Sequence, residues 1–353
     1  MSEEKQYRVV VNAEAVDTHD NYTEPVAHKK HARKNNGDDS DTDISDAEAE
    51  DEEPANEEVY MCDDPATDYI DLTNQRLEQI GDLSQCVNLE ELVLRHNRLT
   101  NSCIKDFASL ITLKRIDLYE NRLTPLEGNP FSELKNLEEL DLSFNELRST
   151  RGFEGLVELR QLYLIQNKIT KIGDLSPLTS LTLLELGSNR IRVMENLHTL
   201  TKLQELYLGR NKITQLRDLN NLTNLRILSL QSNRLTKIDG LSALVNLEEL
   251  YLSHNGIEKM EGLEGLRKLR ILDVSSNFLT AIEGLEDLDS LEELWANNNK
   301  VPDLSFLPAL ATKAKFTALY FEHNPAAYNA DYVTTVRASL PNLTQLDADM
   351  FGL

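Results

Sequence analysis

One pattern of leucines and asparagines, L-x-x-L-x-L-x-x-N-x-L/I, recurs from residue 69 onward and constrains the fold more than any other feature of the chain. Aligned on its asparagine position, the pattern occurs at Gln75, Asn97, Asn121, Asn145, Asn167, Asn189, Asn211, Asn233, Asn255, Asn277, Asn299 and Asn324. The steps between these positions are 22, 24 and 24 residues, then seven of 22 and one of 25. Such a nearly fixed period predicts a stack of equivalent structural units.

Each unit carries its own folding signal. The L-x-L leucines alternate with other residues, which is typical of a short strand with one buried face. One unit cannot cover its own apolar face, so neighbouring units must stack against it. We therefore predict an α/β solenoid, a leucine-rich-repeat horseshoe of about 12 repeats with a parallel concave sheet. The asparagine is expected where the chain turns inward, because its amide can satisfy backbone groups that no strand partner reaches.

The ends of such a stack need covers, since each end exposes part of the core. The solenoid is expected over residues 67–318, and the last repeat with a C-terminal cap over residues 319–353. A helix is predicted from Asp331 to Leu340, ended by Pro341. At the other end, the segment VYMCDDPATD and the irregular first repeat are expected to cover the core.

Residues 1–66 differ in composition from the repeats and are predicted to form an acidic, disordered tail. Between residues 38 and 68 there are 15 acidic residues and no Lys or Arg. Such a segment buries too little apolar surface to offset the entropy of ordering. Ser40 and Ser45 precede acidic residues, a context that acidophilic kinases favour. Whether the basic cluster HKKHARK at 28–34 is an import signal stays open.

Charge and composition narrow the function classes. The net charge of −24 argues against nucleic acid or an anionic membrane as the main partner, because both select for basic surface. No apolar run reaches the length of a membrane span, and the charged N-terminus does not resemble a secretory signal. Cys62, Cys86 and Cys103 are expected to be reduced thiols of an intracellular protein. We found no cofactor, metal or nucleophile motif, which predicts a protein that is not an enzyme.

The residues four before each asparagine position lie between the strand leucines and are expected to line the concave face. They are Asp71, Val93, Asp117, Asp141, Tyr163, Glu185, Tyr207, Ser229, Tyr251, Asp273, Trp295 and Tyr320. Five are acidic, five are aromatic and none is basic. A single tyrosine is explained by its preference for strands, but five rings between carboxylates favour a surface that binds a basic protein.

Several repeats carry more than the general pattern. The segments LLELGSNRIRVMENL, ILSLQSNRLTKIDGL and LYLSHNGIEKMEGLEGL resemble, over about residues 69–350, the regulatory subunit 7 family of protein phosphatase 1. That resemblance implies a leucine-rich-repeat regulator in the nucleus and cytoplasm, monomeric on its own, that binds the phosphatase catalytic subunit on its concave face and acts in mitosis and chromosome segregation. It also implies a ternary complex with inhibitor-3.

The contact residues of that family correspond to Asp141, Tyr163, Glu185, Tyr207, Asp273, Glu293, Trp295 and Tyr320 here. The repeat geometry adds Tyr251 to this protein-binding set. The family often has phenylalanine at the positions of Tyr163 and Tyr207, so each hydroxyl must stay hydrated or find an acceptor. The alternative is another leucine-rich-repeat scaffold that binds a different basic protein at the spindle pole or cytoskeleton. Whether binding inhibits or activates the phosphatase, its affinity and stoichiometry, and the role of tail phosphorylation stay open.

Overall fold

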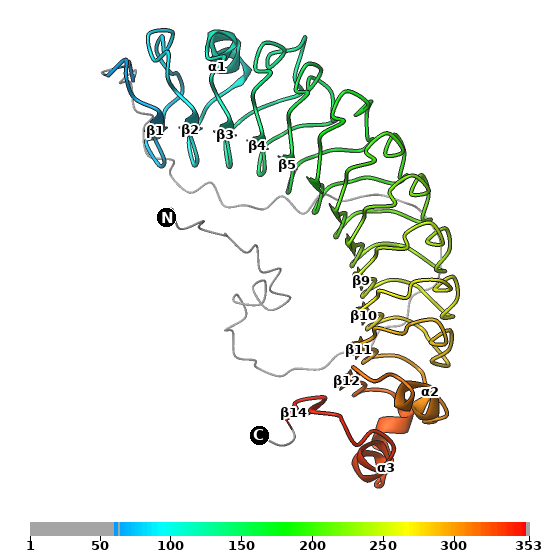
Figure 1. The fold of residues 1–353 in the computed structure, drawn as a ribbon. Coiled ribbons are helices and arrows are strands. Elements are labelled where there is room, and N and C mark those ends of the chain that lie inside the picture. The colour runs from blue at the N-terminus through cyan, green and yellow to red at the C-terminus, as the bar shows by residue number, and fades with distance from the viewer. Residues whose placement is uncertain (1–59, 63, 351–353) are drawn as a thin grey trace, which may run out of the picture. The chain divides into compact units, whose positions relative to one another are not determined.

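The computed structural model describes residues 60–62 and 64–350, and these form a curved stack of repeats with one continuous sheet along its inner edge (Figure 1). The sheet contains fourteen short strands in sequence order. They are β1 (Tyr69–Asp71), β2 (Glu91–Val93), β3 (Arg115–Asp117), β4 (Glu139–Asp141), β5 (Gln161–Tyr163), β6 (Leu183–Glu185), β7 (Glu205–Tyr207), β8 (Ile227–Ser229), β9 (Glu249–Tyr251), β10 (Ile271–Asp273), β11 (Glu293–Trp295), β12 (Ala318–Tyr320), β13 (Gln345–Leu346) and β14 (Asp349–Met350). The strands pair in parallel, except that β14 runs antiparallel to β13. The parallel-sheet solenoid predicted from the repeat is confirmed.

Each strand has the alternation that the repeat predicts. In β9, Leu250 is fully buried, while Glu249 and Tyr251 on either side are partly exposed. The pairing register places equivalent residues side by side, so that Leu250 lies against Leu228 and Leu272. The buried leucines of successive turns join into one core along the stack.

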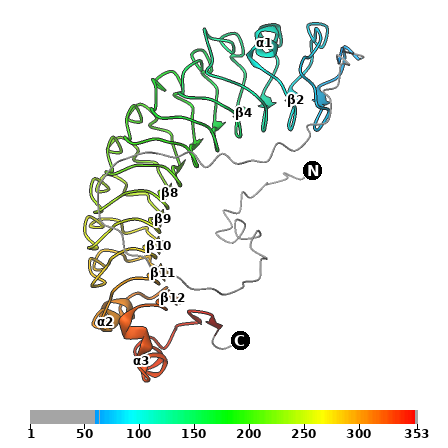
Figure 2. The same ribbon diagram turned by 180° about the vertical axis from the view of Figure 1, so that it is seen from behind.

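Helices occur mainly where the repeat is longer than 22 residues, and at the C-terminal cap. The first 24-residue step contains α1 (Asn101–Ile104) and η1 (Lys105–Ser109), and the 25-residue step contains α2 (Leu307–Ala311). The regular 22-residue turns return from the inner sheet through loops and tight turns alone (Figure 2). A short repeat leaves no residues for a helix on the outer side of the arc.

The repeat asparagines make the bonds predicted for them. The buried amide of Asn167 donates to the carbonyls of Leu142 and Leu164, and its Oδ1 accepts from the backbone N–H of Leu147 at 3.0 Å. The same bonds recur at every repeat asparagine from Asn97 to Asn324, so each one joins two neighbouring turns. Gln75 does not take this role, because it is exposed and donates only to its neighbour Thr73.

Residues 319–350 form the last repeat and the C-terminal cap. The helix α3 (Tyr332–Ser339) begins after Asp331 and ends before Leu340, as predicted, and follows η2 (Pro325–Tyr328). The Tyr332 hydroxyl donates to Asp347 at 2.9 Å. The other carboxylate oxygen of Asp347 accepts two backbone N–H groups, from Phe321 and Glu322, at 2.6 and 2.8 Å. This one side chain therefore ties the cap to the last full turn.

The N-terminal end corrects two expectations. Tyr60 pairs in parallel with Ile80, and its carbonyl accepts the N–H of Gly81 at 2.8 Å, so the ordered body begins before the expected boundary at residue 66. Residues 1–59 of the predicted tail, with both serines and the basic cluster, lie outside the described residues. Cys62 and Cys86 were expected to be reduced, but they form a disulfide with Cα atoms 6.2 Å apart. The pairing of Tyr60 with Ile80 brings the two cysteines together, which their spacing in sequence does not reveal.

Within the described part of the chain, no helix has both the length and the apolar character needed to cross a membrane.

Candidate protein-binding surface

The side chains between the strand leucines form one file along the inner sheet, but they differ in exposure. The strand register aligns Tyr207 with Ser229, Ser229 with Tyr251, and Trp295 with Tyr320. Seven predicted site residues in this file are partly exposed: Asp141, Tyr163, Glu185, Tyr207, Tyr251, Trp295 and Tyr320. Of the remaining two, Glu293 is partly exposed in an adjoining row, formed by the residues six before each asparagine position, whereas Asp273 is buried. The file and this adjoining row are the two inner rows.

The partly exposed rings on four of these strands are each bonded to a polar side chain two residues earlier on the same strand. The hydroxyls of Tyr207 and Tyr251 donate to Glu205 and Glu249, each at 2.8 Å. The Tyr163 hydroxyl donates to the Gln161 amide oxygen at 2.8 Å, and the Trp295 indole N–H donates to Glu293 at 3.0 Å. Each hydroxyl has therefore found an acceptor. We call these four the ring–acceptor pairs. The signal was visible in sequence as E-L-Y, Q-L-Y and E-L-W but was not recognised there.

The ring–acceptor pairs occur on every second strand. Strands β5, β7, β9 and β11 read Q-L-Y, E-L-Y, E-L-Y and E-L-W, whereas β6, β8 and β10 read L-L-E, I-L-S and I-L-D. Two strands span about 10 Å, so a smaller or buried residue lies between successive rings. Ser229 and Asp273, each 4% exposed, occupy two of these intervening positions.

The alternation ends at β12, and the rings there form a cluster. Tyr251 meets Trp295 edge to face at 6.2 Å between ring centroids, and Trp295 meets Tyr320 at 5.6 Å. Edge-to-face contacts of this kind contribute beyond the area that they bury. Tyr251, Trp295 and Tyr320, with the carboxylates of Glu249 and Glu293, make one patch of joined rings edged by negative charge, which we call the aromatic–acidic patch.

Asp273 lies beneath the aromatic–acidic patch rather than on it. Its Oδ1 accepts from both the backbone N–H and the hydroxyl of Ser275, at 3.0 and 2.6 Å. Burial raises the pKa of this carboxyl, while the bonds from Ser275 and Ser253 oppose that rise. In the structure Asp273 therefore supports the surface from below.

Glu185 occupies the gap between Tyr163 and Tyr207. Its Oε1 accepts from the backbone N–H of Gly187 at 2.7 Å, and no cation of the described chain forms an ion pair with it. Burial raises the pKa of this carboxyl from 4.5 to about 8, so it is largely protonated at neutral pH. A lysine or arginine brought to this position by a partner would favour the ionised form.

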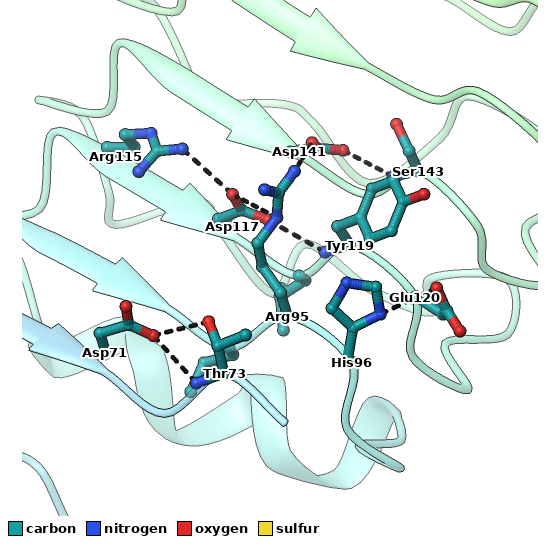
Figure 3. A network of polar contacts seen from close by, with 12 residues as sticks. Asp71, Thr73, Arg95, His96, Arg115, Asp117, Tyr119, Glu120, Asp141 and Ser143 are labelled. Carbon is teal, nitrogen blue, oxygen red and sulfur yellow. Dashed lines mark hydrogen bonds and ion pairs between the residues drawn. The ribbon is translucent and has the colours of Figure 1, made fainter. Parts of the chain in front are cut away.

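The N-terminal part of the inner face carries an ion-pair network instead (Figure 3). Arg95 and Arg115 both contact Asp117 Oδ2, at 3.1 and 3.0 Å, and Arg115 also donates to Glu139 at 2.9 Å. Asp141 joins the edge of this network at 3.8 Å from Arg95. Burial raises the Asp141 pKa to about 6, although Arg95 and the bonds from Ser143 lower it. The sequence analysis did not identify Arg95, which lies two residues before Asn97 and not at the position four before it.

Three rings adjoin this network on the loops that follow the strands. Tyr119 lies between His96 and Phe144, with centroids 5.2 and 4.7 Å away, and the Arg95 guanidinium lies 4.8 Å from the centre of its ring. His96 Nδ1 is 2.9 Å from a carboxylate oxygen of Glu120. The positive charges at this end already have carboxylate partners. The negative charge of the inner face that no internal cation neutralises is therefore greater toward β11.

Two family models match the repeats of this chain. The model described as "Leucine rich repeat" matches residues 87–147, and the model described as "Leucine Rich repeats (2 copies)" matches residues 135–178, 179–221, 223–265 and 267–309. Together these matches cover more than half of the chain.

Solved structures and one curated relative are also similar. An internalin of Listeria monocytogenes aligns with a TM-score of 0.61 and 24% identity over 80% of this chain and 86% of its own. A leucine-rich-repeat protein of Leptospira interrogans aligns with a TM-score of 0.63 and 26% identity over 77% and 76% of the two chains. In Arabidopsis thaliana, "Protein phosphatase 1 regulatory inhibitor subunit PPP1R7 homolog" is 44% identical over 41 residues, which is 12% of each protein. The fold, the repeat register and the family matches agree, and the chain belongs to the leucine-rich-repeat proteins.

Proposed function

We propose that this protein is a non-catalytic regulatory subunit that binds the catalytic subunit of protein phosphatase 1 through its concave face. In this proposal it acts in the nucleus and cytoplasm, including in mitosis, and is monomeric without its partner. A ternary complex with inhibitor-3 belongs to the same proposal.

The aromatic–acidic patch is the observation that carries the proposal. Large rings in contact with one another are typical anchors of protein interfaces. The Glu249 and Glu293 carboxylates lie at the rim of the rings, each held by a hydrogen bond from a ring. From β4 to β12, neither of the two inner rows contains a Lys or Arg. A basic protein surface therefore meets oriented negative charge without having to displace an internal cation.

The choice of phosphatase rests on sequence similarity. The repeats resemble the regulatory subunit 7 family, and the short match to the Arabidopsis protein carries a phosphatase regulator's name. The length of the inner sheet is compatible with a globular partner, since the strands from β1 to β12 span roughly 50 Å.

A binding experiment tests this function. The full chain is immobilised, and binding of the purified phosphatase catalytic subunit is measured for wild type, Trp295→Ala and Phe278→Ala. Phe278 is an exposed ring outside the inner rows and is therefore the matched control. We expect Trp295→Ala to weaken binding at least about 30-fold, as for a central anchor, and Phe278→Ala to leave it unchanged.

Two results would contradict the proposal. Equal binding by all three proteins would remove the aromatic–acidic patch from the interface. Absence of phosphatase binding, together with recovery of a different basic protein from cell extract that Trp295→Ala no longer captures, would favour the alternative scaffold function.

A further inference from the structure

A second charged surface lies on the loops that follow the strands, outside the inner face. The residue directly after the repeat asparagine is basic in seven of the first eight repeats: Arg76, Arg98, Arg122, Lys168, Arg190, Lys212 and Arg234, with Glu146 as the exception. The inner rows, by contrast, are acidic. The two signs of charge are thus segregated onto different faces of the same repeats.

Backbone bonds hold these basic residues in a file. The N–H of Lys212 donates to the carbonyl of Ile191 at 2.8 Å, and the N–H of Arg234 donates to that of Ile213 at 2.8 Å. Successive turns are therefore hydrogen-bonded to each other at this register, as in a sheet, with a spacing of about 5 Å. Arg190, Lys212 and Arg234 consequently project from three consecutive turns at equivalent positions.

Two further arginines widen the file. Arg210 precedes a repeat asparagine and Arg192 lies three residues after one, and both are exposed. Together with Arg190, Lys212 and Arg234 they make five cations on three turns, which we call the basic patch. Among the residues that the structure describes, no carboxylate forms an ion pair with any of the five. The neighbouring cations Lys168, Lys171 and Lys237 do have carboxylate partners.

Several cations at the opposite rim of the stack, each directly before a strand, are instead paired with a carboxylate of an adjacent turn. Lys114 contacts Glu90 at 2.7 Å, Arg226 contacts Glu248 at 2.9 Å, and Arg270 contacts Glu292 at 2.8 Å, all between adjacent turns. The repeat thus readily neutralises a cation with a carboxylate of the next turn. At the basic patch, cations of like charge stand in consecutive turns instead, which costs free energy unless an anion binds.

We propose that the basic patch is a docking site for an acidic polypeptide segment of a partner protein. Carboxylates on one face of a helix are 5–6 Å apart, and those on one face of an extended segment about 7 Å apart, so either matches the file within the reach of Arg and Lys side chains. A nucleic acid fits less well. The affinity of a protein for a nucleic acid grows with the number of phosphate contacts along an extended basic surface, and the acidic inner face limits the extent of such a surface here. This docking does not depend on the proposed phosphatase binding.

The test compares two variants of the full chain with the same change in charge. The first is the triple variant Arg190→Gln, Lys212→Gln, Arg234→Gln. The matched control is Lys114→Gln, Arg226→Gln, Arg270→Gln on the opposite rim. Binding of a fluorescein-labelled oligoglutamate peptide is followed by fluorescence anisotropy at low salt and again at physiological salt. We expect the first variant to lose affinity by at least about tenfold and the control to bind like wild type.

Three outcomes would overturn the proposal. The first is absence of peptide binding by the wild type. The second is an equal loss of peptide affinity in both triple variants, which would indicate a response to net charge alone. The third is tighter binding of a labelled single-stranded oligonucleotide than of the peptide. Circular dichroism of the variants verifies that each one is folded. A loss of affinity confined to the first variant, with a wild type that prefers the peptide, supports the proposal.

Discussion

The indole N–H of Trp295 donates a hydrogen bond of 3.0 Å to the carboxylate of Glu293, two residues earlier on the same strand. Residues i and i+2 of a strand lie on the same face, so the ring and the acid form a unit within one turn. The same unit on alternate turns gives the inner face a period of two repeats. Rings with their own acceptors therefore recur about 10 Å apart along the inner face.

Removing one hydroxyl tests whether the ring–acceptor pairs matter for binding. In Tyr251→Phe the ring contact with Trp295 remains, but Glu249 loses the donor that orients it. A net hydrogen bond of about 0.5–1.5 kcal/mol predicts an approximately 2- to 10-fold weaker affinity for the phosphatase, measured by titration calorimetry. Tyr251→Ala should weaken it further, because the ring is lost as well. Equal affinities of Tyr251→Phe and wild type would show that the hydroxyl does not contribute.

The repeat asparagine predicts a large effect on stability. Asn167→Ala leaves the backbone N–H of Leu147 and the carbonyls of Leu142 and Leu164 without their side-chain partner in a buried turn. We expect a loss of about 1–3 kcal/mol in the free energy of unfolding, measured by urea denaturation. The matched control is Gln75→Ala, at the equivalent position of the first repeat, where the side chain is exposed. Its effect should stay within about 0.5 kcal/mol. Similar losses in both variants would contradict the role of the amide.

The Glu185 carboxyl predicts a dependence of stability on pH. Its pKa is about 8 in the folded protein and 4.5 ordinarily, so between these values the folded state binds more protons than the unfolded state. The contribution of this group to the free energy of unfolding therefore falls as pH rises from about 4.5 to about 8. Glu185→Gln cannot ionise and keeps the acceptor for Gly187. We expect the variant to gain stability relative to wild type across this interval, measured by urea denaturation at several pH values. Parallel curves would contradict the raised pKa.

Much of the fold follows from the sequence because the repeat determines it locally. The leucines, the asparagine and the helix Tyr332–Ser339 were predictable from spacing and from Pro341. The file of inner-face residues that forms the candidate site was predictable, since strand register alone places Tyr251, Trp295 and Tyr320 together. The depth of each side chain was not, because it depends on neighbours in the adjacent turns. Asp273 follows the same rule as Tyr251, yet it is buried beneath the rings of the flanking turns.

The disulfide between Cys62 and Cys86 predicts a redox dependence of the N-terminal end of the stack. It links the segment that pairs with Ile80 to a fully buried position of the first turn, across 24 residues. Closing a loop of that length is worth about 3 kcal/mol through the entropy of the unfolded chain. We therefore expect Cys62→Ser to increase hydrogen exchange in β1 and β2 and to lower the urea midpoint. Dithiothreitol should reproduce this effect in wild type and have none on the variant. Identical wild-type midpoints with and without the reductant would show that the bond does not stabilise this end.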